Sequence, residues 1–160
     1  MRRLLKVFTI ALLVMFSSTM LLAQESPFVG SWKRDPAKSK LTGAPAPKSE
    51  TRTVKAQRGA STVTFDRVDT DGSKFSFSYT TNLDGKASPI TGSGVPGGAD
   101  AYASKGVDAN TYATTWLKGG KEIGMSRTVV SRDGKVTTTT FKGKDATGKP
   151  ISAVTVYDKQ

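Results

Sequence analysis

The sequence contains no cysteine and no histidine among its 160 residues. Without cysteine, the chain has no disulfide bond, no thiolate metal ligand and no cysteine to carry the lipid of a bacterial lipoprotein. Without histidine, it lacks the commonest general base, the commonest zinc ligand and the usual proximal haem ligand. The fold must therefore be held by its hydrophobic core, and any catalysis would depend on carboxylates or lysines.

Carboxylates give little support to an enzyme or to a metal site. Three of the ten aspartates, Asp71, Asp84 and Asp133, stand directly before glycine, where turn geometry explains them. An enzyme would require a paired carboxylate inside the fold, for which Asp66 and Glu122 are the candidates, but their phase in the expected strands places both toward solvent. Calcium at Asp69 and Asp71 would lack the ligand run of a known calcium loop. We expect a non-enzymatic protein without metal or other cofactor.

Residues 1–23 have the three-part pattern of a secretory signal peptide. A basic start precedes an apolar run from Val7 to Phe16, and hydroxyl residues then lead to cleavage after Ala23. An uncleaved anchor is the alternative, but the run is shorter than the roughly 20 apolar residues that a spanning helix needs. We predict a secreted or periplasmic protein that is not inserted in the membrane after cleavage.

Residues 24–160 are long enough for one domain with its own core. Cleavage removes three of the 24 basic residues, so 21 basic residues face 13 acidic ones and the net charge is +8. The lysines are spread along the domain and do not cluster beside exposed aromatic residues, which argues against nucleic-acid binding. Dispersed lysines keep strand edges from pairing with other chains, and they favour loose attraction to anionic surfaces.

From Glu50 onward, short stretches rich in threonine, valine and aromatic residues alternate with turn sequences. Asp-Gly and Gly-Gly pairs supply the positive φ angles that tight hairpins need. Together with the stretch around Trp32, the expected strands lie near 50–57, 61–69, 73–80, 86–91, 99–105, 111–118, 121–131, 135–142 and 151–158. Consecutive hairpins favour an all-β, antiparallel up-and-down barrel of about 8–10 strands, because closure removes exposed edges. An immunoglobulin-like sandwich is the alternative.

One short helical turn is expected after the first strand. Asp35 is suited to cap free backbone amides, and Pro36 has the φ angle of a first helical residue. The turn is expected over 36–40, and the proline-containing stretch 43–47 reads as an extended loop.

The start of the domain, Phe28-Val29-Gly30-Ser31-Trp32-Lys33, resembles the start of calycin-superfamily proteins, that is, lipocalins and fatty-acid-binding proteins. In that superfamily the tryptophan of Gly-x-Trp closes one end of the barrel, and a late-strand arginine stacks over it in lipocalins. The resemblance implies that Gly30 and Trp32 form such a plug, with Arg127 over the indole. It makes residues 24–160 a single lipocalin-like domain, similar to small secreted proteins of bacteria.

The end of the chain is similar to fatty-acid-binding proteins in residues 153–158, but two features depart from them. The prolines of 43–47 leave too little room for their helix pair. Those proteins hold a ligand carboxylate with Arg-x-Tyr on the last strand, whereas this chain has Thr155-Val156-Tyr157. The resemblance therefore implies a neutral or weakly polar ligand, unless Arg67 or Arg127 points inward.

Aromatic residues alternate with polar ones in the expected strand 73–80, which places the aromatic residues on one face. A small barrel is either filled by such side chains or leaves room for one ligand. Aromatic, methionine and valine walls with a few hydroxyls are typical of small-molecule pockets. The expected lining residues are Val63, Phe65, Phe75, Phe77, Tyr79, Tyr102, Tyr112, Met125 and Tyr157.

We predict a secreted barrel that binds a small apolar or weakly polar molecule. The alternative is a filled structural or protein-interaction module of the periplasm, which would act through its loops on an unknown protein partner. The interior volume separates the two hypotheses.

Overall fold

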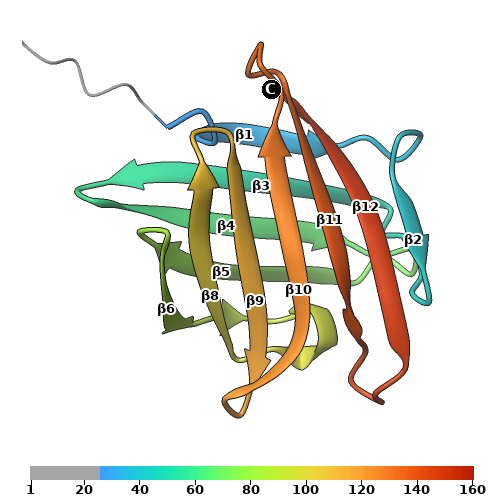
Figure 1. Cartoon of the computed structure of the whole chain (residues 1–160). Helices are drawn as coiled ribbons and strands as arrows, with labels where there is room; N and C mark the ends of the chain where they lie inside the picture. Colours follow the sequence, from blue (N-terminus) through green and yellow to red (C-terminus); the bar gives the residue numbers. More distant parts are fainter. Residues whose placement is uncertain (1–25) are drawn as a thin grey trace, which may run out of the picture.

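The computed structural model describes residues 26–160 (Figure 1). The expected signal peptide at residues 1–23 lies outside the described residues. Residues 26–160 form a single 12-stranded antiparallel sheet that curls into a nearly closed barrel. The predicted all-β antiparallel barrel is thereby confirmed. No helix in this part of the chain has the length and apolar character needed to cross a membrane.

The strands follow one another around the barrel as a meander, and their order in the sheet is β6-β8-β9-β10-β11-β12-β1-β3-β4-β5-β7, with β2 beside β12. In Figure 1, β3, β4 and β5 run across β8–β12, so the curled sheet has two facing layers. The strands are β1 (Gly30–Arg34), β2 (Lys40–Thr42), β3 (Ser49–Gln57), β4 (Ala60–Val68), β5 (Lys74–Thr81), β6 (Asp84–Pro89), β7 (Thr91–Gly92), β8 (Ala101–Asp108), β9 (Thr111–Lys118), β10 (Lys121–Val130), β11 (Val136–Lys144) and β12 (Pro150–Lys159).

Two pairs of short strands act as single interrupted strands. β1 and β2 pair one after the other with β12. β6 and β7 are separated by Ile90 alone; β6 pairs with β8 and β7 pairs with β5. Because β6 and β7 stand at opposite ends of the strand order, their connection brings the two edges of the sheet together. Counting each interrupted pair once turns the twelve strands into the ten that the sequence predicted.

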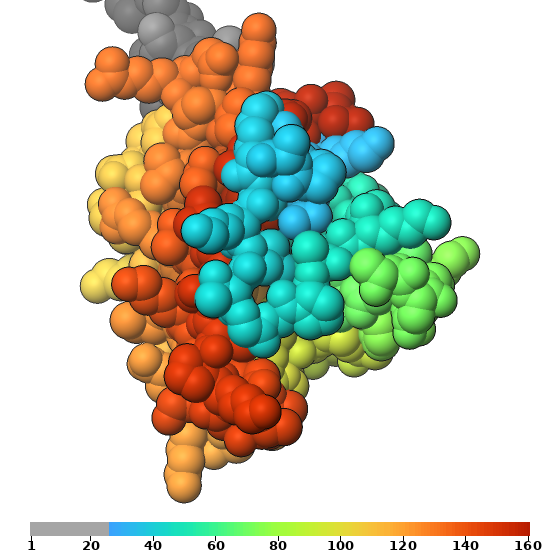
Figure 2. Space-filling view, turned by 90° about the vertical axis from the view of Figure 1, so that its right-hand side faces the viewer, coloured from blue at the N-terminus to red at the C-terminus, as the bar shows by residue number. Residues whose placement is uncertain are grey.

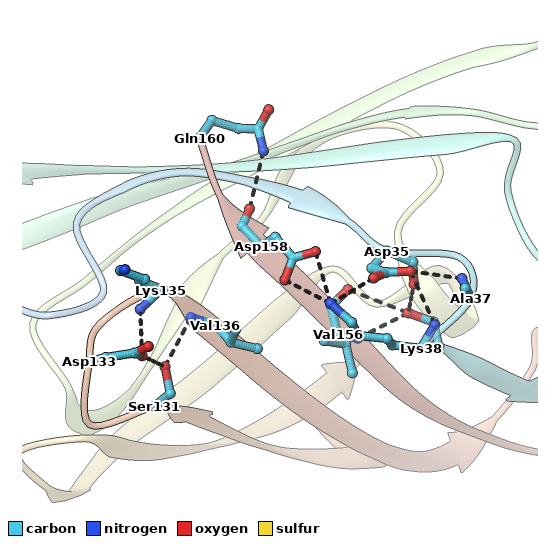
Figure 3. A network of polar contacts seen from close by, with 11 residues as sticks. Asp35, Ala37, Lys38, Ser131, Asp133, Lys135, Val136, Val156, Asp158 and Gln160 are labelled. Carbon is cyan, nitrogen blue, oxygen red and sulfur yellow. Dashed lines mark hydrogen bonds and ion pairs between the residues drawn. The ribbon is translucent and has the colours of Figure 1, made fainter.

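A polar turn joins β1 to β2 and ties both to the last strand (Figure 3). The Asp35 carboxylate accepts hydrogen bonds from the backbone amides of Ala37 (2.8 Å) and Lys38 (3.1 Å). The Lys38 ammonium lies 2.9 Å from Asp35 Oδ2 and 3.3 Å from Asp158 Oδ1. The hydrogen bond from Lys38 lowers the pKa of Asp35, so the turn is held by an ionised carboxylate.

This turn corrects one expectation from the sequence. Asp35 caps it as predicted, but the stretch 36–40 forms a single hydrogen-bonded turn at 36–38 instead of a helical one. The reason is tertiary, since Lys40 already pairs with Val154 on β12 and the amide of Val156 donates to the Ser39 hydroxyl (3.0 Å). Within residues 26–160, the one 3-10 turn is η1 (Pro96–Gly98), which precedes β8.

The core occupies the inside of the barrel, and one end of it is closed by Trp32. This side chain is fully buried, and its indole Nε1 donates to the carbonyl of Phe28 at 2.8 Å. The ring of Phe28 packs edge-on against Tyr112 at 4.8 Å. The segment before β1 therefore folds back under the barrel and seals that end, which leaves the other end as the route to the interior.

Candidate functional site

A cavity of about 420 Å³ lies inside the barrel. Its walls come from the inward faces of β3–β5 and β9–β12, and the loops at 44–47 and 94–97 border it. Figure 2 shows a narrow opening beside the cyan segment that follows β2. The interior is thus partly hollow, and the loops at 44–47 and 94–97 lie at this end of the cavity.

One wall of the cavity is aromatic. Phe65 stacks on Phe77 with ring centroids 4.8 Å apart, because the two residues face each other across β4 and β5. The Trp116 indole meets Phe77 and Phe141 edge-on, each at 6.4 Å. Such edge-to-face and offset contacts are the favoured arrangements of aromatic rings, so this part of the lining is well packed as well as apolar.

Another part of the cavity lining consists of small hydroxyl side chains on β9–β11, the strands that also carry Trp116 and Phe141, and these leave space beside the aromatic rings. The inward positions of β9–β11 include Thr114, Ser126, Thr128 and Thr139. Most of these hydroxyls are already bonded: Trp116 Nε1 donates to Ser126 Oγ (3.0 Å), and the Thr128 and Thr139 hydroxyls lie 2.9 Å apart. Short side chains beside aromatic ones give room for a ligand without leaving polar groups unsatisfied.

A charged cluster forms the polar part of the cavity; we call its members, Arg34, Glu50, Arg52 and Tyr157, the arginine cluster. Arg52 is only 1% exposed, and its guanidinium carbon lies 4.7 Å from the Tyr157 ring centroid and 5.7 Å from that of Trp32. Its Nη2 donates to Thr137 Oγ1 at 2.5 Å. Arg34 is 6% exposed and donates to the carbonyl of Pro47 at 3.4 Å.

Tyr157 connects the two arginines with the carboxylate of the cluster. It pairs with Arg34 across β1 and β12, and its hydroxyl donates a short hydrogen bond to Glu50. Burial raises the pKa of Tyr157 well above its usual value, and the negative charge of Glu50 adds to this effect. The phenol therefore stays neutral and acts as a hydrogen-bond donor at physiological pH.

The structure places the predicted lining residues in three groups. Phe65, Phe75, Phe77, Tyr79, Tyr112 and Tyr157 line the cavity. Val63 and Tyr102 are buried in the barrel but do not line it; Val63 borders a second cavity of about 30 Å³, and Tyr102 donates to the carbonyl of Thr80. Met125 is a correction: it is 56% exposed on the outer face of β10.

The predicted contact between Arg127 and Trp32 is absent. Ser126, Thr128 and Val130 are the buried positions of β10, so the alternation of the strand turns Arg127 outward into solvent. Arg52 lies over the indole in its place, and Lys159 Nζ lies 5.1 Å from the same ring centroid. Gly30 does lie beside the tryptophan, because an added Cβ would be 3.9 Å from the indole nitrogen.

The sequence interpretation missed Arg34, Glu50 and Arg52, although a signal for them exists. Arg34 follows Trp32 by two residues, and Arg52 precedes Val54 by two. Residues two apart in a strand share a face, so an inward Trp32 and an inward Val54 place both arginines inside. Charge alone made them look like surface residues.

The exposure of Arg127 gives a direct prediction. Replacing Arg127 with Ala should change the free energy of unfolding by no more than about 0.5 kcal/mol, because surface substitutions away from special features are nearly neutral. Urea denaturation of the purified protein measures this. A loss above about 2 kcal/mol would mean that Arg127 is buried after all and that the strand has the opposite phase.

Neither of the carboxylates considered for catalysis lies inside. Asp66 and Glu122 are both exposed, and the Ser76 hydroxyl donates to Asp66 at 2.8 Å. Asp69 forms an ion pair with Arg67, whose Nε lies 2.8 Å from Asp69 Oδ1. Residues 26–160 contain no group of three or more metal-binding side chains.

No protein-family model and no curated protein matches the sequence.

Proposed function

We propose that this protein is a secreted or periplasmic, non-enzymatic barrel of the lipocalin-like type that holds one small molecule with an apolar body. The observation that carries the proposal is the cavity of about 420 Å³, lined mainly by aromatic and small hydroxyl side chains. Ligand pockets have volumes of roughly 300–1,000 Å³ and are mostly apolar with a few polar groups. The interior of this barrel fits both criteria.

The alternative of a filled structural or interaction module has less support. A filled barrel would bring large side chains from both layers into contact. Here Phe77 and Trp116 do meet across the layers, with ring centroids 6.4 Å apart, but a cavity of about 420 Å³ remains beside them, lined in part by the short side chains of Thr114, Ser126 and Thr139. We therefore favour a binding role for the interior over a role confined to the loops.

Two further observations agree with a calycin-like barrel outside the cytoplasm. A fully buried Trp32 closes one end of a nearly closed antiparallel barrel, as the Gly-x-Trp resemblance implies. The signal-peptide pattern of residues 1–23 supports export. A closed barrel end and export are both compatible with a carrier that meets apolar molecules outside the cell.

A neutral fluorescent probe tests the proposal. N-phenyl-naphthylamine should bind the purified protein with enhanced emission. The variant Ala153→Trp, at a position that lines the cavity, should weaken binding at least about tenfold, because the indole takes the space of the ligand. The neighbouring variant Val154→Trp is the matched control, since Val154 is 40% exposed on the outside and should leave binding unchanged.

The outcomes are distinct. Loss of binding in Ala153→Trp but not in Val154→Trp supports an interior site. Equal binding by both variants would place the probe on the surface, and absence of binding by the unmodified protein would contradict the proposal. Mass spectrometry of the protein purified from its own host then looks for a carried molecule.

A further inference from the structure

We infer that the arginine cluster binds the head group of a monoanionic amphiphile, of the carboxylate class, whose apolar part occupies the aromatic side of the cavity. This inference depends on the proposed function, which it makes more specific. The absence of an arginine before Tyr157 on the last strand implied a neutral or weakly polar ligand. We instead infer a negatively charged one, because β1 and β3 supply the arginines that β12 lacks.

The first argument is unbalanced charge. Arg34 and Arg52 are only 6% and 1% exposed. Within residues 26–160, no carboxylate oxygen lies within 4.0 Å of a guanidinium nitrogen of either arginine. Buried charges in proteins are normally paired, because an isolated ion loses its hydration without compensation. Two buried guanidiniums beside one cavity therefore form an incomplete site.

The second argument is unused hydrogen-bonding capacity. Each guanidinium carries five N–H donors. Arg52 donates to Thr137 and, at 3.4 Å, to Thr139, and Arg34 donates to Pro47; the buried Nε atoms of both arginines have no acceptor among the described residues. Both side chains line the cavity, so an oxyanion placed there would meet several free donors.

The third argument fixes the number of charges on the ligand. The cluster holds two guanidiniums and one carboxylate, that of Glu50, which leaves one positive charge. Asp145 also borders the cavity, but its carboxylate accepts hydrogen bonds from Thr147 and Lys149 within its own turn. Arg67 also lines the cavity, but Asp69 neutralises it at 2.8 Å. A singly charged head group completes the balance, and a planar carboxylate matches the fork of an arginine in a bidentate contact.

The fourth argument is the position of the cluster relative to the apolar wall. Glu50, Arg52 and Tyr157 line the same cavity as Phe65, Phe77 and Trp116. One molecule can thus place a charged end among the arginines and an apolar end against the aromatic rings. Neither a free small anion nor a pure hydrocarbon would use both parts.

Titration calorimetry with three probes tests the inference on the unmodified protein at neutral pH. Decanoate should bind at least about tenfold more tightly than decanol, because hydrogen bonds to a charged group are about twice as strong as neutral ones. Acetate, which has the same head group without the apolar tail, should bind more weakly than both.

Two variants with the same loss of charge locate the site. Arg34→Gln should weaken decanoate binding about tenfold and change decanol binding less than about twofold. Arg127→Gln removes an equal charge from the outer face of β10 and should change neither affinity. Thermal unfolding shows whether each variant is folded. If Arg34→Gln does not fold, the ratio of decanoate to decanol affinity in the unmodified protein decides whether the site prefers an anionic head group.

Three results would overturn the inference. If decanol binds as tightly as decanoate, the binding function stands but the anionic head group does not. If acetate binds as tightly as decanoate, the site takes a free anion and not an amphiphile. If no probe binds, including the neutral dye, the proposed function fails and the inference fails with it.

Discussion

Replacing Trp32 with Ala should lower the free energy of unfolding by about 3–5 kcal/mol, as large-to-small changes of buried aromatic residues do. The side chain is fully buried and closes one end of the barrel, so the substitution opens a cavity that its neighbours cannot fill. It also leaves the carbonyl of Phe28 without its indole donor and removes the ring that lies 5.7 Å from the Arg52 guanidinium. Urea denaturation measures the loss.

The adjacent residue provides the control for this variant. Lys33 is exposed in the same strand, and Lys33→Ala should stay within about 0.5 kcal/mol of the unmodified protein. A loss below about 1 kcal/mol for Trp32→Ala would contradict its role as the closing residue of the barrel.

Replacing Gly92 with Ala should lower the free energy of unfolding by about 2–6 kcal/mol, as the combined result of backbone strain and overpacking. Gly92 has a φ angle of +107°, and an added Cβ would lie 2.2 Å from the carbonyl oxygen of Ser76 and 2.7 Å from the Cα of Phe77. These atoms belong to β5, which β7 meets through only the pairs Phe77–Gly92 and Ser78–Thr91. The substitution therefore forces open the seam that closes the barrel.

Hydrogen exchange and a second glycine separate the clash from the unusual φ angle. The amide of Ser93, which donates to the carbonyl of Ser76 at 2.8 Å, should exchange faster in Gly92→Ala. Gly72 also has a positive φ of +87° but open space around it, so Gly72→Ala should cost only about 1–2 kcal/mol. Equal losses in the two variants would contradict a specific role for the β5–β7 seam.

The number of strands and most turns could be predicted because both depend on local sequence. Period-two alternation and turn residues act over a few positions, whatever the rest of the chain does. The Asp84-Gly85 pair stands between the expected strands 73–80 and 86–91, so the sequence predicted a turn there, but it is part of β6 instead. There Gly85, with a φ of +81°, lies at an irregularity in the pairing with β8, and the chain reverses just before it, at Leu83, with a φ of +59°. Long-range pairing with β8 selected the bulge over the turn.

Local sequence also left open which face of β10 points into the barrel. One face of the strand carries Met125, Arg127 and Val129, and the other carries Ser126, Thr128 and Val130. Each face mixes apolar and polar residues, so alternation does not say which one points inward. Pairing with β9 and β11 decides it, because a shift of one residue would exchange the two faces.

The sequence by itself determined an all-β chain of ten strands, from its turn residues, and an aromatic inner face around Phe77, from the spacing along one strand. The burial of Trp32 was implied by the Gly-x-Trp resemblance. Only the tertiary structure decided what lies opposite these residues. The cavity is lined by side chains from both layers, aromatic ones such as Phe77 and Trp116 and short ones such as Thr114 and Ser126, and the arginine cluster depends on β1, β3 and β12 lying side by side. From sequence alone, a charged residue on a strand is expected at the surface. Whether it is buried, as Arg34 and Arg52 are, depends on the neighbours that the packed barrel places around it.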